Sequence, residues 1–174
     1  MFEVDRPEVL ARRAERLRGI SQNPHALAVP IDFELDNLAA VLTSNGFISR
    51  GVRSLFLWEG VTYYLPDSAV DAVLACVATL SEPPSSIVFD YVTRAFYEGD
   101  ERGHGAAKLA DGWRSQGNAH RSGVADVQAL LQPHGFRLRE QLDPAAMEQR
   151  FLSGLPGGPR KVWGVVRMAH AERL

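Results

Sequence analysis

Short apolar segments alternate with amphipathic helical patterns along the first half of this 174-residue chain, and this alternation constrains its fold more than any other feature. Helices are recognised by apolar residues at a spacing of three and four, and buried strands by short continuous apolar runs. The predicted order is strand 2–5, helix 7–18, strand 26–31, helix 35–42, strand 54–58, helix 67–80 and strand 87–89. Strands that alternate with helices in this way favour an α/β fold with a parallel sheet and right-handed crossovers.

The second half of the chain is less regular. Residues 93–121 have a weak hydrophobic signal, and a connection of this length is usually functional or contains a helix of its own, which we place at 104–114. Regular patterns then return, and they predict helix 123–133, strand 136–141, helix 144–152, a Gly/Pro loop over 154–160 and strand 161–169. We expect this closing strand–helix–strand unit to add an antiparallel strand at the C-terminal edge of the sheet.

Composition excludes several classes of function. The formal net charge of −2 gives no reason to expect nucleic acid or an anionic membrane as a partner, and no apolar run approaches the ~18 residues of a membrane span. The start of the chain lacks the basic and apolar regions of a signal peptide, and the single cysteine, Cys76, fits a reducing compartment, so we expect a cytoplasmic protein. Cys76 lies in an apolar helical pattern, which favours an unreactive buried thiol.

Acidic residues stand where several predicted strands end. Asp5, Asp32 and Glu59 each follow an apolar strand, and Asp90 follows a fourth. Capping of the next helix is the structural interpretation, and it suits Asp5 and Asp32 because aspartate is a preferred N-cap residue. Glutamate is a poor N-cap, so Glu59 is harder to explain in this way. In a parallel sheet, ligands bind at the carboxyl ends of the strands, which is the edge these acids would share.

A row of carboxylates at this edge favours a particular ligand. One carboxylate can accept both hydroxyl hydrogens of a ribose, a second can accept from an adenine amino group, and the apolar ring of Phe33 can pack on the purine. The same acids would repel a pyrophosphate, and the chain has neither G-x-G-x-x-G nor G-x-x-x-x-G-K. A cationic sulfonium nucleoside is therefore favoured over NAD or ATP.

Several motifs resemble a known family. The segments FEVDRPEVLARRAERL, ALAVPIDF, LFLWEGVTYYLPDSAVDAVL, FDYV and LLQPHGFRLRE look like those of the leucine carboxyl methyltransferase-like family. The resemblance runs over most of the chain, and it is strongest at FEVDRP and WEGVTYYLP and weakest over 93–121. It implies a class I methyltransferase, Rossmann-like α/β sheet and S-adenosyl-L-methionine-dependent methylation of a carboxylate or hydroxyl on an unknown small-molecule acceptor.

The resemblance also implies roles for individual residues. Asp5 matches the acid that holds the ribose hydroxyls, Asp32 and Phe33 match the pair that contacts adenine, and Glu59 matches the acid beside the methionine part of the cofactor. Tyr64 matches a tyrosine near the methyl-acceptor pocket, with a core aromatic as the equal alternative. No catalytic residue is identified, because an ionised carboxylate acceptor needs no general base. The histidines show no metal-ligand spacing.

The same resemblance implies an incomplete domain. Family members carry, before the FEVD segment, a first strand with a Gly-rich turn, and this strand lies between the second and fourth strands of the sheet. The chain corresponds to residues from the second strand onward, so we interpret 1–174 as one methyltransferase-like domain that is a fragment, a late start or a shortened protein, with 93–121 as a variable insertion shaping the acceptor site. We expect low stability or a homo-oligomer formed through an exposed sheet edge. The alternative function is a non-catalytic remnant that acts as a binding or interaction module.

Overall fold

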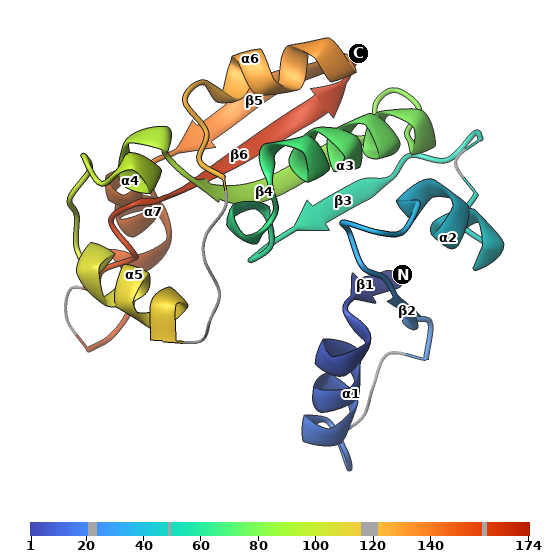
Figure 1. Ribbon diagram of the computed structural model, residues 1–174, viewed down its shortest axis with the longest axis horizontal. Coiled ribbons are helices and arrows are strands. Elements are labelled where there is room, and N and C mark those ends of the chain that lie inside the picture. Colours follow the sequence, from blue (N-terminus) through green and yellow to red (C-terminus); the bar gives the residue numbers. More distant parts are fainter. Residues whose placement is uncertain (21–23, 49, 116–121, 158–159) are drawn as a thin grey trace.

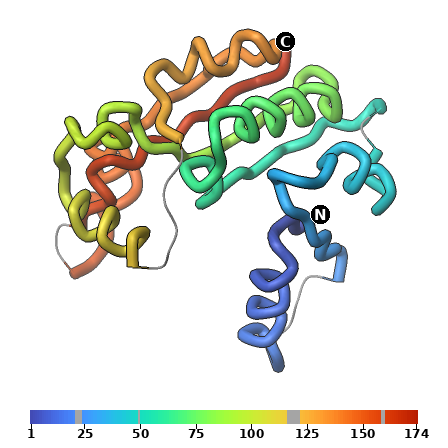
Figure 2. Tube along the Cα trace, viewed as in Figure 1, coloured from blue at the N-terminus to red at the C-terminus, as the bar shows by residue number. Residues whose placement is uncertain are grey.

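The strands of the chain form two separate sheets. The computed structural model describes residues 1–20, 24–48, 50–115, 122–157 and 160–174. In the smaller sheet, β1 (Phe2–Asp5) pairs in parallel with β2 (Leu27–Pro30). In the larger sheet, the order is β3-β4-β6-β5 (Figures 1 and 2). Its strands are β3 (Leu55–Trp58), β4 (Ser86–Val92), β5 (Phe136–Leu142) and β6 (Val166–Arg173).

Helices connect and cover these strands. They are α1 (Pro7–Arg16), α2 (Leu38–Ser44), α3 (Asp67–Leu80), α4 (Arg94–Glu98), α5 (Ala106–Ser115), α6 (Val127–Leu131) and α7 (Pro144–Met147), with short 3₁₀ or π turns at Thr62–Tyr64, Gln132–His134 and Glu148–Leu152. Helices α3 and α6 lie on one face of the larger sheet, and α1 projects away on the other side, below β1 and β2 (Figure 1). The predicted alternation of strands and helices is confirmed in its order.

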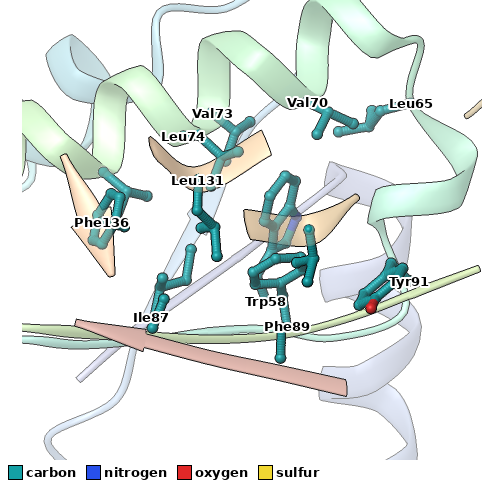
Figure 3. Packing of buried hydrophobic residues seen from close by; sticks show 14 of the residues in the cluster. Trp58, Leu65, Val70, Val73, Leu74, Ile87, Phe89, Tyr91, Leu131 and Phe136 are labelled. Carbon is teal, nitrogen blue, oxygen red and sulfur yellow. The ribbon is translucent and has the colours of Figure 1, made fainter. Parts of the chain in front are cut away.

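The main core lies between α3, α6 and the larger sheet. Leu74, Ile87, Phe89, Leu131 and Phe136 are at most 1% exposed and pack together between these elements (Figure 3). The apolar run of β4 explains this position, because β4 is paired on both sides and its residues must be apolar on the face that the helices cover.

The unpaired sheet edges that the resemblance implies are present at β1 and β3 in the described chain. β1 pairs with β2 and β3 pairs with β4, but β1 and β3 do not pair with each other. Each therefore keeps one unpaired edge. Leu55 and Leu57 of β3 are 70% and 65% exposed, since they point to the face opposite α3. Phe56 and Trp58 alternate with them and pack against the core.

The position of the C-terminal strand differs from the prediction. β6 does contribute the expected antiparallel pairing, but it lies inside the sheet, between β4 and β5, and β5 is the edge strand. Ala169 and Ala171, two residues apart on one face of β6, are buried in the main core. Sequence periodicity does not distinguish an inner strand from an edge strand when the side chains are small.

This strand also begins later than predicted, at Val166 instead of residue 161. The preceding backbone crosses a glycine turn: Gly164 donates its N–H to the His104 carbonyl oxygen at 2.8 Å. A Cβ atom on Gly103 would lie 2.9 Å from the Gly164 carbonyl oxygen, and one on Gly105 would lie 2.5 Å from the Trp163 ring. Because these backbones pack so closely, the Gly164 N–H bonds to the His104 carbonyl oxygen instead of to a neighbouring strand.

The middle of the chain holds the predicted helix and one further helix. The helix predicted over 104–114 is confirmed as α5, and α4 precedes it as an additional short helix capped by Thr93, whose Oγ1 accepts from the Phe96 N–H at 3.1 Å. The helix predicted over 123–133 is shorter, with Asp126 as the N-cap of α6. Residues 116–121 of the variable stretch lie outside the described residues.

Candidate functional site

A groove of about 480 Å³ lies between the two sheets. β1 forms one wall, β3 forms the other, and Phe33 and Phe47 contribute from the segments around α2. The Phe47 ring contacts Phe2 of β1, with centroids 5.5 Å apart, and Phe56 of β3, with centroids 5.9 Å apart. One aromatic ring therefore bridges the two strands and lines the groove.

Three of the predicted cofactor residues meet at this groove, namely Asp5, Phe33 and Glu59. Asp5 and Glu59 stand at the carboxyl ends of β1 and β3, as the sequence predicted. Both strands run in the same sense in Figure 1, so their carboxyl ends face the same edge. The site residues themselves remain a prediction, but the structure gathers these three around one cavity.

Asp5 does not act as the helix cap that the structural interpretation required. Arg6 is the N-cap residue of α1 and makes no side-chain capping bond. Asp5 Oδ1 instead accepts the Arg6 N–H at 2.8 Å, and Glu8 forms an ion pair with Arg6 at 2.9 Å. One oxygen of Asp5 is thus held by its own turn, which fixes the direction of the carboxylate, and a carboxylate has lone pairs for further donors.

Asp32 is separated from the groove. Its Oδ1 accepts the Glu34 N–H at 2.9 Å, and its own N–H donates to Asp36 Oδ2 at 2.8 Å. It does not cap α2 either, because the N-cap is Asn37, whose Oδ1 accepts the Ala40 N–H at 3.0 Å. The structure therefore uses Asp32 to shape the turn that carries Phe33 to the groove.

The turn that presents Glu59 is fixed by a buried carboxylate. Gly60 adopts φ +70°, a left-handed conformation that favours glycine, and its N–H donates to Asp90 Oδ1 at 2.8 Å. Thr62 Oγ1 donates to the Asp90 carbonyl oxygen, and the Tyr63 hydroxyl lies 3.4 Å from Asp90 Oδ2. These contacts tie the turn to β4 and leave the Glu59 side chain exposed at the edge of the groove.

Asp90 itself lies inside β4 and is only 8% exposed, so the prediction that it ends a strand is wrong. Burial raises the pKa of its carboxyl above the usual range, the Gly60 N–H acts in the opposite direction, and the nearby charge of Glu59 adds to the increase. Burial likewise raises the pKa of Tyr63. The sequence signal for this role was present, since Tyr91 and Val92 continue the apolar run past the acid.

Tyr64 lies in an aromatic cluster and does not line the groove. Its ring is 4.8 Å from Tyr63 and 5.7 Å from Trp113 of α5, and Phe96 of α4 also contacts Trp113 at 6.0 Å. Burial raises the pKa of Tyr64. The predicted role beside an acceptor pocket stays a prediction, and the observed packing is that of its alternative, a core aromatic.

Trp58 is a residue of the groove that sequence reasoning missed. It lines the groove, is 7% exposed, and its Nε1 donor finds no hydrogen-bond partner among the described residues. A buried donor without an acceptor is rare and costly in proteins. An acceptor supplied by a ligand or by another segment of polypeptide would satisfy it.

Metal and membrane sites are not found in the part of the chain that the structure describes. No group of three or more His, Cys, Asp or Glu side chains is placed to hold a metal ion there. Among the same residues, no helix has the length and apolar character that crossing a membrane requires.

Sequence comparisons identify related proteins. Residues 1–78 match the model of the leucine carboxyl methyltransferase family. A protein of Mycolicibacterium smegmatis is 30% identical over 147 residues, which are 79% of this chain and 48% of the relative. A protein of Streptomyces coelicolor is 36% identical over 91 residues, which are 52% of this chain and 30% of the relative. Both are named "Putative S-adenosyl-L-methionine-dependent methyltransferase". The chain thus spans 30% to 48% of the length of these two relatives.

Solved structures show the same fold over part of their length. The mitomycin 7-O-methyltransferase MmcR superposes with a TM-score of 0.62 at 19% identity, over 99% of this chain and 41% of that one. LepI, whose structure contains SAM, superposes with a TM-score of 0.54 at 14% identity, over 100% of this chain and 36% of that one. The fold is therefore the α/β fold of class I methyltransferases, with a mixed sheet that contains antiparallel pairing. Over residues 1–78, the chain thus matches the leucine carboxyl methyltransferase family, and its relatives are named as putative S-adenosyl-L-methionine-dependent methyltransferases.

Proposed function

We propose that this chain provides the nucleoside-binding half of an S-adenosyl-L-methionine-dependent O-methyltransferase. The observation that carries the proposal is the convergence of Asp5, Phe33 and Glu59 on one groove. The relatives named as S-adenosyl-L-methionine-dependent and the neighbour solved with SAM support the choice of cofactor. Residues 1–174 act in this proposal as one methyltransferase-like unit.

The residues of the groove suit this cofactor. The Asp5 carboxylate would accept the ribose hydroxyls, the Phe33 ring would pack on the adenine, and Glu59 would face the cationic end of the ligand. The unpaired Nε1 donor of Trp58 offers a further bond to a ligand acceptor. Asp32 would contribute indirectly, by shaping the turn before Phe33, since its Oδ1 already accepts the Glu34 N–H.

The chemistry follows from the bound group and from the acceptor. S-adenosyl-L-methionine supplies, when bound, a sulfonium methyl group that an oxygen nucleophile can attack in line. A carboxylate acceptor is ionised at neutral pH, so the protein would act mainly by alignment and by exclusion of water. This fits the described groove, whose titratable groups at the carboxyl end, Asp5 and Glu59, are both acids.

The acceptor would bind beside the aromatic cluster. Residues 93–121 carry α4 and α5, and Trp113 of α5 stacks on Tyr63 with centroids 5.0 Å apart. The turn from Glu59 to Tyr64 joins this cluster to the groove, so the acceptor and cofactor regions would share one turn. We propose a small carboxylic acid or hydroxyl compound as the acceptor, with Tyr64 near it.

Calorimetric titration with S-adenosylhomocysteine tests the proposal. Asp5→Asn should weaken binding ten- to a hundredfold, because a hydrogen bond to a charged group contributes roughly 1.5–3 kcal/mol. The 2′,3′-dideoxy analogue lacks the ribose hydroxyls, so Asp5→Asn should change its affinity little. Glu59→Gln should also weaken the binding of S-adenosylhomocysteine, whereas Glu98→Gln, on α4, should leave this binding unchanged.

Two results would contradict this function. If Asp5→Asn weakened the binding of S-adenosylhomocysteine and of its 2′,3′-dideoxy analogue equally, the proposed contact between Asp5 and the ribose hydroxyls would be wrong. The absence of binding heat at millimolar ligand would favour the alternative, a non-catalytic module.

A further inference from the structure

We propose that Trp58 recognises the purine of the cofactor: its indole N–H donates to a ring nitrogen of the adenine on the side of the glycosidic bond. This contact rests on the proposed function, because it involves the same nucleoside in the same groove. It adds a neutral hydrogen-bond donor to Asp5, Phe33 and Glu59, whose side chains supply two acceptors and an apolar ring.

Trp58 is the last residue of β3, and its ring lies in the main core. It alternates with the exposed Leu57, so its side chain lies on the face of the sheet that α3 covers. Figure 3 shows the ring beside Phe89, and the two ring centroids are 6.0 Å apart. Trp58 is 7% exposed and also lines the groove. A ligand in the groove can therefore reach this residue, although it belongs to the core.

The indole N–H of Trp58 is an unpaired donor in surroundings that are otherwise well paired. Among the described residues, its Nε1 is the one buried side-chain nitrogen or oxygen for which no hydrogen-bond partner is found. Other buried side chains do have partners: Thr62 Oγ1 donates to the Asp90 carbonyl oxygen, and Ser122 Oγ donates to the Thr62 carbonyl oxygen at 2.9 Å. Because an unpaired buried donor is costly, a ligand that brings an acceptor to Trp58 binds more favourably.

The groove that Trp58 lines is apolar where it is most deeply buried. The lining there consists of side chains that are at most 5% exposed, namely Leu42, Val73, Val77 and Ile87. An ionised acceptor would lose its hydration in such surroundings without gaining a counter-charge, so the partner of Trp58 should be neutral. A planar heterocycle with ring nitrogens meets this requirement, and adenine is the part of S-adenosyl-L-methionine that has this character.

The position of Trp58 in the chain favours one side of the purine. Trp58 directly precedes Glu59, which faces the cationic end of the ligand in the proposed function, and this end is joined to the ribose. The ribose is attached to N9 of the adenine. N3 and N7 flank that bond, whereas N1 lies at the far end of the ring. The Trp58 indole should therefore meet N3 or N7, and N1 should make no bond to it.

NMR of the indole N–H groups tests this contact on the unmodified chain. The 3 tryptophans are Trp58, Trp113 and Trp163, and their indole resonances are assigned by through-bond correlations. Saturating S-adenosylhomocysteine should move the Trp58 indole proton downfield and slow its exchange with solvent. The 1-deaza analogue should give the same shift, and either the 3-deaza or the 7-deaza analogue should give none. Homocysteine, which lacks the purine, should leave the resonance in place.

Trp58→Phe measures what the donor contributes to affinity. Phenylalanine keeps an aromatic ring and removes the N–H, so S-adenosylhomocysteine should bind about tenfold more weakly. The deaza analogue that gives no shift should bind the parent protein and this variant within about twofold, because it has no acceptor to lose. Trp163→Phe, at a residue that is 40% exposed and does not line the groove, is the matched control and should leave both affinities unchanged. Thermal unfolding checks that both variants are folded.

Three results would overturn the contact between Trp58 and the purine. They are a Trp58 indole that does not shift while calorimetry shows S-adenosylhomocysteine bound, the same shift with all three deaza analogues, and loss of the shift with the 1-deaza analogue alone. Each of these results occurs with the ligand bound and leaves the proposed function in place. An absence of binding heat contradicts the proposed function itself, so calorimetry distinguishes the two failures.

Discussion

The backbone N–H of Gly60 donates to the buried carboxylate of Asp90 at 2.8 Å, and this bond ties the turn after β3 to the neighbouring strand β4. The turn carries Glu59 on one side and Tyr63 and Tyr64 on the other. A single buried acid therefore positions both the edge of the groove and the start of the aromatic cluster. The protonation of Asp90 and the conformation of Gly60 can be tested independently.

Asp90→Asn should change how stability depends on pH. Burial raises the pKa of the Asp90 carboxyl in the folded state, so the folded protein holds this proton more tightly than the unfolded chain. The associated stability is fully present below the unfolded pKa and is lost as pH rises through the folded pKa. Asparagine does not titrate and can still accept from Gly60.

The free energy of unfolding of Asp90→Asn, relative to the parent protein, should therefore increase between pH 3.5 and pH 7. Urea unfolding at a series of pH values measures this difference. A difference that is constant or decreases with pH would show that the carboxyl is not destabilised by burial.

Gly60→Ala should destabilise the protein by about 1–2 kcal/mol, because its φ of +70° places an L-residue in the left-handed region. Steric contact contributes little, since the nearest atom to a new Cβ is the Tyr63 hydroxyl oxygen at 3.9 Å. Gly112→Ala is the matched control, because Gly112 lies in α5 with nothing within 4 Å of a new Cβ. It should stabilise by up to about 1 kcal/mol. Thermal and urea unfolding of both variants check the opposite signs.

Phe47→Ala should loosen the smaller sheet from the larger one. The Phe47 ring is the contact shared by Phe2 and Phe56, so its loss should cost about 2 kcal/mol, less than for a fully buried phenylalanine. Limited proteolysis should then cut faster between β2 and α2. Phe151→Ala, at a side chain that is 54% exposed, should leave both measurements near those of the parent protein. Equal cleavage rates for the two variants would contradict the bridging role.

Cys76 should react slowly with iodoacetamide. Burial raises the pKa of the Cys76 thiol to about 11, and the thiolate is the reactive form. At pH 8.5 we expect the folded protein to be alkylated at a rate at least tenfold below that of a free cysteine. The rate should rise toward pH 11. In urea, where the chain is unfolded, Cys76 should react at the rate of a free cysteine. Mass spectrometry of the modified chain measures these rates. Rapid labelling of the folded protein at pH 7 would contradict the expectation.

Local patterns in the sequence were sufficient to predict most elements and three residues of the groove. The apolar runs and the acids that follow them predicted β1 and β3 with Asp5 and Glu59 at their ends. These features depend on neighbours within a few residues. The helical pattern also predicted Cys76 as a buried, unreactive thiol. The structure makes Cys76 half-buried, and its low reactivity stays a prediction.

Long-range contacts were not predictable from these patterns. The insertion of β6 between β4 and β5 depends on pairs such as Ser86 with Glu172, which are far apart in sequence. The late start of β6 depends on the contact between Gly103 and Gly164, where glycine gives no apolar signal. Asp90 was placed at a strand end because an acid within a strand is unusual. Only its partners, Gly60 and Tyr63, explain why it is accommodated there.

The insertion of β6 has a consequence for the order in which the molecule can assemble. β4 and β5 contact each other through β6, so synthesis through Val92 and Leu142 yields two segments that lack their common neighbour. A nascent chain stopped before Val166 would hold a bare β4 edge, and such edges recruit other chains. Ribosomal pausing between residues 143 and 165 should therefore increase the share of the protein that is lost to aggregation.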